Sequence, residues 1–486
     1  MSFRIKNYRK LKMIGIDKSL LTLEQVLLAT DGVHVLGPSR ITFTTVQTDS
    51  RNVIKDTFFV PLIGESQDGH KYIPQAIEKG AGTVFICKKN FEDDSSWFVE
   101  LHQSNPGVTF IAVDNTLAAL QKMAGAYVEK FPHLIKIAVT GSSGKTTTKE
   151  ILASIMRQKY SVVCNQANLN SETGLPLSVF SIRKEHECGI FEMGMNRENE
   201  IGEISAVLKA HFAIVTNIGT AHIGLLGSRE NIAREKAKVF DHFNNFGTGV
   251  IPYDDDFVDF LRDQIEGKVV LYGQDTDSVK FIGDLGLKGT KFSVGGIETV
   301  LSLPGKYNYK NALGAIALAQ VLGLTAQQIS SGISSLEPMF GRSQVLEGKY
   351  TIVQDCYNAN PDSMEKAIEF VSSVNDGRKK IFVLGDMLEL GENSRLEHEK
   401  AGELAALSSA DAAIFVGEEM KAAYEKFVSM GCKKDSFYAE GRSEDTMASV
   451  ARKIESLVPE KSIVLVKGSR GMGMERIVGI LEGGEK

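Results

Sequence analysis

The residues best suited to chemistry lie in one short segment that combines glycines, hydroxyl groups and a lysine, Gly141-Ser142-Ser143-Gly144-Lys145-Thr146-Thr147. An apolar run that predicts a buried strand precedes it, and a stretch with helical apolar spacing follows. Backbone N–H groups of such a loop can surround phosphate oxygens, and the N-terminus of the following helix favours an anion. Lys145 would reach the β- and γ-phosphates, and the Thr146 hydroxyl would ligate Mg²⁺. The segment therefore predicts a phosphate-binding loop.

This loop departs from the common pattern, because Val139 stands where the first glycine is expected. A glycine- and serine-rich turn before a helix is the alternative interpretation. A phosphate loop also does not by itself distinguish a kinase, a GTPase, an ATPase and a ligase. Other side chains must separate these classes.

Two further candidates follow apolar runs that predict strands. Glu192 lies at the end of the run 189–193, and His222 comes shortly after the run 212–216. The carboxyl ends of parallel strands face the crevice where α/β sheets bind ligands, so Glu192 could hold Mg²⁺ and His222 a metal or substrate. An ordinary solvated glutamate and a structural histidine are the alternatives. Lys236 and Lys238, on the next helical segment, would by default be surface charges.

Length and composition limit the class of protein that must position these residues. The chain has 486 residues, 43% hydrophobic and 24% charged, which indicates about three domains with buried cores. Its 55 basic and 61 acidic residues leave a net charge of -6, which argues against a general nucleic-acid binder. Collagen-like, disordered and disulfide-stapled chains are excluded.

Cysteine usage and hydropathy indicate a cytoplasmic protein without membrane insertion. The five scattered cysteines are expected to be free thiols in a reducing cytosol. The uncharged stretch 311–336 is interrupted by Gln, Ser and Thr, and its Ala and Leu spacing indicates an amphipathic core helix and not a membrane span. Asp17, Lys18 and Glu24 interrupt a would-be signal segment, so the basic N-terminus is interpreted as an exposed extension.

The order of apolar runs predicts an α/β fold with three domains, at 1–133, 134–338 and 339–486. In the first, strands are expected at 57–62, 83–87 and 109–113, followed by a helix with apolar residues from 117 to 128. The second begins with a mostly parallel sheet (134–139, 189–193, 212–216), continues with antiparallel hairpins over 269–303 and ends with a helix at 308–322. Beyond a linker at 338–341, strands at 351–354, 381–384, 413–416 and 463–466 alternate with helices, as in a Rossmann-like domain.

Taken together, these segments resemble the Mur ligases, ATP-dependent enzymes that form amide bonds in peptidoglycan precursor synthesis. The loop from Thr140 to Thr147 looks like the family's shorter phosphate loop, and the run Asn168-Leu169-Asn170 with Gly174-Leu175-Pro176 resembles another family segment. Thr48-Asp49-Ser50-Arg51 and Asp68-Gly69-His70 look like the family's uridine-nucleotide-binding domain. Asp355 with Tyr357-Asn358-Ala359-Asn360-Pro361, the run 385–391 with His398, and Lys467-Gly468-Ser469-Arg470 resemble the member that adds D-alanyl-D-alanine.

The resemblance implies a reaction, two substrates and a set of site residues. UDP-N-acetylmuramoyl-tripeptide would be phosphorylated by ATP to an acyl phosphate, and the amine of D-alanyl-D-alanine would attack it. Lys145, Glu192, His222 and Lys236 would be catalytic; Thr146 and Glu192 would hold one Mg²⁺, His222 would help to hold a second, and a carbamylated Lys236 would orient Mg²⁺. Besides the phosphate loop, Asn308, Arg342 and Asp355 would bind ATP. The substrate-binding residues would be Thr48, Ser50, Arg51, Asp68, Gly69, His70, Asn168, Tyr357, Asn358 and Asn360.

Two departures and several alternatives accompany this resemblance. Gln354 stands where a second aspartate is common in the family. Tyr307 replaces the histidine of the family run next to the adenine, although Asn308 is kept. The alternatives are the Mur ligase that adds the third amino acid, a folate polyglutamate-forming relative, and a phosphate-loop ATPase or switch. A catalytically dead scaffold is disfavoured because the catalytic side chains are present. We expect a monomer that closes its domains around the substrates.

Overall fold

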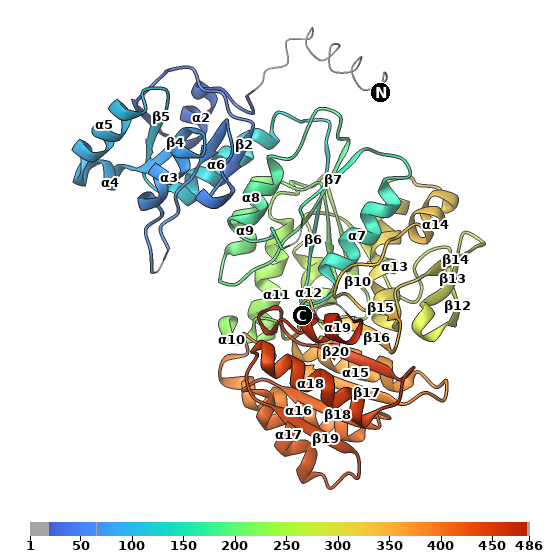
Figure 1. Ribbon diagram of the computed structural model, residues 1–486. Helices are drawn as coiled ribbons and strands as arrows, with labels where there is room; N and C mark the ends of the chain where they lie inside the picture. The colour runs from blue at the N-terminus through green and yellow to red at the C-terminus, as the bar shows by residue number, and fades with distance from the viewer. Residues whose placement is uncertain (1–18, 65, 167, 484–486) are drawn as a thin grey trace, which may run out of the picture. The chain divides into compact units, whose positions relative to one another are not determined.

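The computed structural model describes residues 19–64, 66–166 and 168–483, and forms two compact units (Figure 1). The first unit comprises described residues up to 134 together with 165–184 and 206–208. The second unit comprises 135–164, 185–205 and the chain from 209 onward. The basic N-terminal extension lies outside the described residues. The two units are described separately below.

The first unit contains a five-stranded sheet in the order β1 (Val33–Leu36), β5 (Thr109–Val113), β4 (Ala81–Cys87), β3 (Thr57–Phe59) and β2 (Thr45–Gln47). Only β1 is antiparallel to its neighbour. The helices of this unit include α2 (Leu23–Thr30), α3 (Ile73–Glu78), α4 (Lys88–Asp93), α5 (Ser95–Ser104), α6 (Thr116–Val128) and α8 (Gly174–Val179). Every residue of β5 is buried, as expected for a continuous apolar run between covering helices. The three predicted strands and the predicted helix are confirmed, the strand predicted at 57–62 only over 57–59.

The second unit is built around a parallel six-stranded sheet. Its order is β11 (Gly267–Tyr272), β10 (Gly247–Pro252), β9 (Phe212–Val215), β6 (Ile135–Thr140), β8 (Cys188–Glu192) and β7 (Val162–Cys164). From β6 the chain passes through α7 (Lys145–Met156) to the edge strand β7 and returns, so that β8 and β9 flank β6. This reversal creates the crevice in which open α/β sheets bind ligands. The phosphate-loop segment lies at that point.

Helices α7, α13 (Lys306–Val321) and α14 (Ala326–Ser334) share one hydrophobic core with this sheet. The helix predicted at 308–322 is confirmed as α13, whereas the uncharged stretch 311–336 does not form one helix but extends from α13 into α14. Gly323 adopts a left-handed conformation (φ 71°) after α13, and Thr325 begins α14 with a capping box. Helices α9 (Glu200–Leu208), α10 (Ile223–Leu226), α11 (Arg229–Ala237) and α12 (Val258–Asp263) complete the chain between the strands.

A separate antiparallel sheet consists of β12 (Val279–Asp284), β13 (Thr290–Val294) and β14 (Ile297–Leu301). Gly295 and Gly296, both at positive φ (55° and 86°), form the two-residue turn between β13 and β14. The hairpins predicted over 269–303 are therefore confirmed only from 279 onward. The earlier part forms β11, which is a parallel edge strand of the six-stranded sheet.

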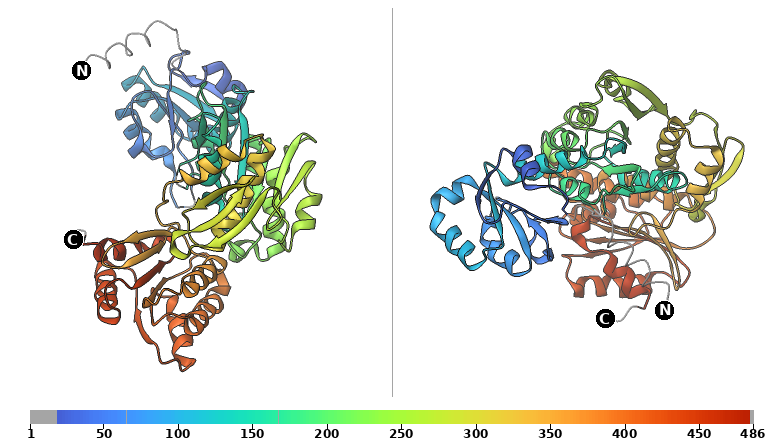
Figure 2. Two further views of the ribbon diagram at one scale, coloured as in Figure 1. Left: turned by 90° about the vertical axis from the view of Figure 1, so that its right-hand side faces the viewer. Right: turned by 90° about the horizontal axis from the view of Figure 1, so that it is seen from above.

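The C-terminal part, orange to red in Figure 2, has its own six-stranded sheet. The order is β15 (Gln344–Glu347), β16 (Thr351–Asp355), β20 (Ile463–Lys467), β17 (Lys380–Gly385), β18 (Ala412–Val416) and β19 (Asp435–Ala439), with β15 antiparallel. Helices α15 (Pro361–Ser373), α16 (Ser394–Leu407) and α17 (Met420–Ser429) contribute to one core, and α18 (Glu444–Leu457) with α19 (Glu475–Leu481) to another. The four predicted strands and the α/β class are confirmed.

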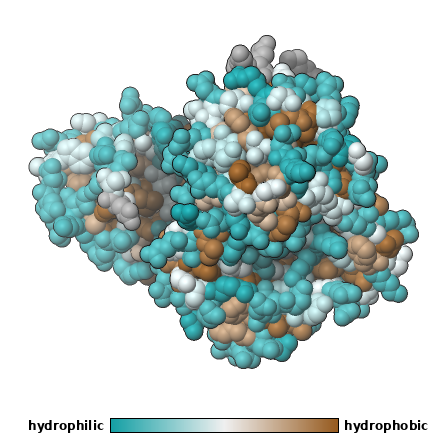
Figure 3. All heavy atoms as spheres, turned by 90° about the horizontal axis from the view of Figure 1, so that it is seen from below, coloured by the Kyte–Doolittle hydropathy of each residue, from teal (hydrophilic) through white to brown (hydrophobic). Residues whose placement is uncertain are grey.

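The surface shows no large apolar face on the side drawn in Figure 3, where brown patches are scattered among hydrophilic residues. Within the described part of the chain, no helix is both long and apolar enough to cross a membrane.

Candidate active site

The phosphate-loop segment curls between β6 and α7. Gly141 and Gly144 adopt positive φ values of 147° and 79°, and a Cβ atom on Gly144 would overlap Asn311 Oδ1. Lys145 begins α7, and its Nζ donates to the carbonyl oxygen of Gly141 at 2.8 Å. The backbone thus adopts the tight turn, with the lysine folded over it, that a phosphate-binding loop requires.

A second wall of the loop comes from the segment that follows β9. Asn217 Nδ2 donates to Ser143 Oγ, and Ser143 N donates to Asn217 Oδ1, both at 2.9 Å. Ser142 Oγ accepts from Gly219 N at 2.9 Å. These bonds connect the loop to the next strand of the sheet. Asn217 was not predicted as a site residue, although a polar residue directly after a buried strand is a usable signal.

Thr146 lies at the centre of a short polar chain. Its hydroxyl donates to Glu192 Oε2 at 2.6 Å and accepts from Arg342 Nη2 at 2.9 Å. Glu192 ends β8 and is only 3% exposed, which excludes the interpretation of an ordinary solvated glutamate. The Arg342 guanidinium also lies over the Tyr357 ring, 4.0 Å from its centroid. Three of the predicted site residues therefore meet at one hydroxyl.

The buried Lys236 and the half-buried Lys145 give this site two amines that an anion would stabilise. Lys236 is 0% exposed, so its default interpretation as a surface charge is wrong, and Met195 Sδ lies 4.0 Å from its Nζ. Burial, together with the Lys145 charge, lowers the pKa of Lys236 well below its ordinary value. Burial also lowers the pKa of Lys145, while Glu192 opposes that shift. Phosphate oxygens in the loop would favour both charged forms.

His222 comes from the same segment as Asn217 and belongs to this electrostatic cluster. Its Nδ1 lies 3.1 Å from Glu389 Oε2, and its side chain is 15% exposed. Burial lowers the pKa of His222, and the charges of Lys145 and Lys236 act in the same direction. The structure therefore brings the four predicted catalytic side chains, Lys145, Glu192, His222 and Lys236, into one cluster.

The donor set of this cluster suits Mg²⁺ bound together with a nucleotide. Thr146 and Glu192 offer hard oxygen ligands 2.6 Å apart. The buried Thr220 Oγ1, two residues before His222, has no hydrogen-bond partner among the described residues. Over 19–64, 66–166 and 168–483, no three His, Cys, Asp or Glu side chains form a ready-made metal site. Phosphate oxygens and water would therefore complete the coordination of Mg²⁺.

The residues predicted near the rest of ATP have local partners. Asn308 Nδ2 donates to the carbonyl oxygen of Pro304 at 2.7 Å, and the side chain is buried. The Tyr307 hydroxyl lies 2.8 Å from Ser343 Oγ. Asp355 accepts from Ser343 N at 3.0 Å and pairs with the buried Lys467 at 2.7 Å. Asp355 and Tyr307 therefore both hold the linker that carries Arg342.

The C-terminal segment around Tyr357 reaches the phosphate loop through Asn360. The Asn360 side chain caps α15 and also donates to the carbonyl oxygen of Ser142 at 3.5 Å. Asn358 Oδ1 accepts from Ala359 N at 2.9 Å. These contacts place the predicted dipeptide-binding segment beside the phosphate loop.

In the first unit, Asp68 and His70 support each other. His70 Nδ1 lies 2.6 Å from Asp68 Oδ1, and Nε2 accepts from Cys87 N at 2.9 Å. The imidazole is buried and both nitrogens have partners, so His70 orients the loop instead of offering a free nitrogen to a ligand. A Cβ on Gly69 would lie 2.6 Å from the carbonyl oxygen of Leu62, so this turn requires glycine.

The other first-unit candidates differ in exposure. Ser50 is buried and donates to Gln75 Oε1 at 2.6 Å. Arg51 is exposed and pairs with Asp49 at 2.7 Å, which lowers the pKa of Asp49 to about 2. Thr48 is half-buried and Asn168 is exposed. Arg51 and Asn168 are therefore open to a ligand, whereas Ser50 has a structural partner.

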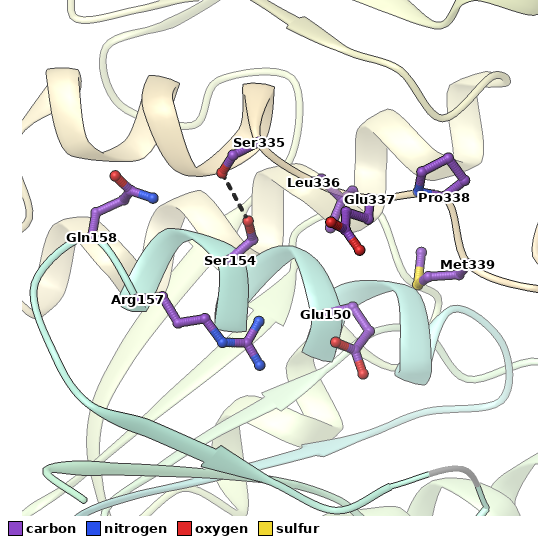
Figure 4. A pocket seen from close by; sticks show the side chains of 9 residues that line it. All are labelled: Glu150, Ser154, Arg157, Gln158, Ser335, Leu336, Glu337, Pro338 and Met339. Atoms are coloured by element: carbon purple, nitrogen blue, oxygen red, sulfur yellow. Dashed lines mark hydrogen bonds between the residues drawn. The ribbon is translucent and has the colours of Figure 1, made fainter. Parts of the chain in front are cut away.

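A hollow of about 420 Å³ lies along α7 (Figure 4). Glu150 and Ser154 of α7, Arg157 directly after it, and the segment 335–339 line the hollow; Ser154 points toward Ser335, with Ser154 Oγ 3.3 Å from Ser335 Oγ. None of the phosphate-loop residues lines it. We therefore place the candidate active site at the loop and not in this hollow.

Family models match three segments of the chain: the Mur ligase family catalytic domain at 42–128, the Mur ligase middle domain at 139–319 and the Mur ligase glutamate ligase domain at 341–470. A UDP-N-acetylmuramoyl-tripeptide--D-alanyl-D-alanine ligase from Treponema pallidum (strain Nichols) is 40% identical over 95% of this chain and 99% of its own length. The protein of the same name from Bacillus subtilis (strain 168) is 32% identical over 89% and 92%.

Solved structures give the same family. A crystal structure of MurF from Acinetobacter baumannii superposes with a TM-score of 0.82 at 28% identity, covering 95% of this chain and 98% of that one. MurF ligase from Thermotoga maritima in complex with ADP gives a TM-score of 0.73 at 25% identity, covering 90% and 97%. The three matched segments include both walls of the phosphate-loop site. The chain belongs to the Mur ligase family.

Proposed function

We propose that this protein joins D-alanyl-D-alanine to UDP-N-acetylmuramoyl-tripeptide and converts ATP to ADP and phosphate. The observation that carries this proposal is that Lys145, Thr146, Glu192 and the buried Lys236 lie together at the predicted phosphate loop, in a chain that is 40% identical, over nearly its whole length, to a ligase of that name. The product would be UDP-N-acetylmuramoyl-pentapeptide, a precursor of peptidoglycan.

The chemistry requires a carboxylate to become an electrophile. The terminal carboxylate of the tripeptide attacks the γ-phosphorus of ATP, and ADP leaves. The free amine of D-alanyl-D-alanine then attacks the acyl phosphate, loses a proton and expels phosphate. Two anions must approach each other in the first step, so positive charge at the phosphates lowers the barrier. Lys145, whose Nζ donates to the Gly141 carbonyl in the loop, and Arg342, which donates to the Thr146 hydroxyl, would supply it.

Mg²⁺ would accompany ATP, held by Thr146 and Glu192, with His222 at a second ion. When bound, it would neutralise charge on the phosphate oxygens. The chain's own part is to fix these ligands: Thr146 by the first turn of α7, and Glu192 by burial at the end of β8. Arg342 donates to the same Thr146 hydroxyl, so the linker that carries Arg342 would contact the site at which Mg²⁺ binds.

Lys236 would act as a carbamate, an anion able to orient Mg²⁺. Only a neutral amine can attack CO₂, and burial lowers the pKa of Lys236 in the required direction. Mass spectrometry on unacidified protein should show an additional CO₂. Short-chain carboxylic acids should restore activity to Lys236→Ala; absence of both effects would refute the carbamate.

The two substrates would bind on different parts of the chain. The first unit would hold the uridine nucleotide through Thr48, Arg51 and the turn at Asp68. The segment Tyr357 to Asn360 would receive the dipeptide beside the phosphate loop. We further propose a cytoplasmic monomer with domains at 1–133, 134–338 and 339–486 that closes when its substrates bind.

The test is phosphate release from MgATP by purified protein, with each of the two substrates added alone and together. We expect release only with both, a product of pentapeptide mass, and loss of activity in Lys145→Ala. Release without the tripeptide nucleotide would indicate an ATPase or switch. Release with another acceptor amine, but not with D-alanyl-D-alanine, would indicate a different ligase.

A further inference from the structure

The segment 217–222 lies between the phosphate loop and the C-terminal part of the second unit. On one side, Asn217 and Gly219 are bonded to Ser143 and Ser142, as described above. On the other side, two acidic residues of the C-terminal part reach it. Neither acid was predicted as a site residue. The segment carries His222, so whatever fixes it also fixes that side chain.

The first of these acids is Asp362, the second residue of α15. Its Oδ2 accepts from Thr220 N at 2.8 Å. A Cβ atom on Gly219 would overlap the same carboxylate oxygen, so the glycine leaves room for Asp362. Asn360, which caps the helix, reaches Ser142 from the same end. The N-terminal end of α15 therefore contacts both the segment 217–222 and the phosphate loop.

The second acid is Glu389, in the loop after β17. Its Oε2 lies 3.1 Å from His222 Nδ1. Both residues adopt left-handed backbone conformations, with φ values of 68° and 66°. Non-glycine residues keep this conformation only where their surroundings hold it, and they cluster at functional sites. The Glu389–His222 contact thus joins two strained positions from different parts of the chain.

Two neighbouring features hold the Glu389 loop in place. His398 is fully buried, accepts from Met387 N at 3.0 Å and donates through Nδ1 to the carbonyl oxygen of Ser394 at 2.7 Å. Beyond Glu389, Gly391 packs against Gly224 so closely that a Cβ on Gly224 would lie 2.8 Å from Gly391 N. The approach is backbone to backbone and depends on both glycines.

We propose that Asp362 and Glu389 are positioning residues that hold the segment 217–222, and with it His222, against the phosphate loop only while the C-terminal part is docked. We call the contacts of Asp362 and Glu389 with the segment 217–222 the clamp. Its role in catalysis rests on the proposed function, whereas its existence does not. Docking of the part that carries the dipeptide-binding segment would then complete the site for phosphoryl transfer. Phosphoryl transfer from ATP would therefore be slow until the C-terminal part is docked.

Hydrogen–deuterium exchange on the protein without substrates tests the clamp directly. Asp362→Ala removes the acceptor of the Thr220 amide, so we expect the exchange of that amide to rise about tenfold or more. Glu389→Gln should raise the exchange of residues 222–227. The matched controls are Glu365→Ala and Glu392→Gln, exposed acids of α15 and of the loop after β17, which should exchange as the wild type does.

Kinetics then test the consequence for catalysis. A misplaced reacting group costs up to about 100-fold, so we expect kcat to fall about 10- to 100-fold in Asp362→Ala and Glu389→Gln. The KM for the uridine nucleotide should stay within about twofold, because neither residue belongs to the first unit. Gly224→Ala keeps both acids but obstructs the approach of Gly391, and should lower kcat in the same way.

Unchanged exchange over 217–227 in both acid variants would overturn the proposal, as would equal kinetic losses in the acidic controls. A fall of kcat accompanied by exchange increases throughout the C-terminal part would also overturn it, since this would indicate general destabilisation. If the wild type proves not to be this ligase, the exchange experiment still decides whether the clamp exists.

Discussion

Replacement of Lys236 by methionine should make the protein more stable while removing its activity. The amine is 0% exposed, and the partner for Nζ in the described chain is Met195 Sδ at 4.0 Å, a weak acceptor. Methionine has nearly the same length and volume but no charge. Lys236→Met therefore removes a buried polar group without leaving a cavity.

The size of the gain follows from the cost of burying that amine. Mutational data give about 1–3 kcal/mol for a buried polar group without a good partner. The nearby Lys145 charge adds to this cost, whereas the carboxylates of Glu235 and Glu192 reduce it. In CO₂-free buffer at neutral pH we expect the free energy of unfolding of Lys236→Met to exceed that of the wild type by about 1–3 kcal/mol.

The pH dependence has a definite sign. The pKa of Lys236 is lower in the folded protein than in the unfolded chain, so between these two values the unfolded state binds one more proton. Wild-type stability therefore rises with pH across this window, relative to Lys236→Met. The difference between the two proteins should shrink as the pH approaches the ordinary lysine pKa. Scanning calorimetry at neutral and alkaline pH measures it.

Activity and a matched control complete the experiment. Phosphate release should fall at least about 10- to 100-fold in Lys236→Met, as expected when a residue that orients a metal is lost. Lys238→Met, at a lysine that is 27% exposed and paired with Glu235, should not increase stability. A Lys236→Met protein that is less stable than the wild type at all pH values would refute this interpretation of the buried amine.

Three further changes test other parts of the site. Thr146→Ala removes the hydroxyl bonded to Glu192, so kcat should fall about 10- to 100-fold, whereas Thr146→Ser should retain most of it; phosphate release measures both. Gly144→Ala places a side chain at φ 79°, a strain of about 1–2 kcal/mol, and should weaken ATP binding in titration calorimetry. Asp355→Ala leaves the buried Lys467 charge unpaired and should destabilise the protein by about 3–5 kcal/mol in denaturant unfolding; full stability would contradict the ion pair.

The sequence was sufficient for the phosphate loop because its signals are local. The turn is specified by glycine, lysine and threonine residues that stand between an apolar run and a helical pattern. In the structure, Gly141 and Gly144 adopt the positive φ values of this turn. Glu192 and His222 were found by a rule of topology, that ligands bind where parallel strands end. The family resemblance supplied the remaining candidate site residues, which the pattern of residues could not.

Other features could not be predicted because they depend on distant parts of the chain. Strand β10 contains two glycines and a terminal proline, and it forms because it is held between β9 and β11. The edge strands β15 and β19 each pair with a single neighbour and are only partly buried, which weakens the apolar signal. The contacts of Asp362 and Glu389 join residues far apart in sequence, so even the family-like run 385–391, which contains Glu389, did not indicate its partner.

Lys236 illustrates why burial matters more than residue type in assigning chemistry. Its helix, α11, also buries Ile232 and Ala233, so helical spacing alone would have allowed position 236 to face the core. Lysine is normally exposed, and that expectation placed it on the surface. Burying the Lys236 amine beside Lys145 has a desolvation free-energy cost, which the same amine would not have if it were exposed to solvent. Such a cost is tolerated where an anion, whether phosphate or carbamate, compensates it in the working state, and this is the reason to seek the chemistry at Lys236.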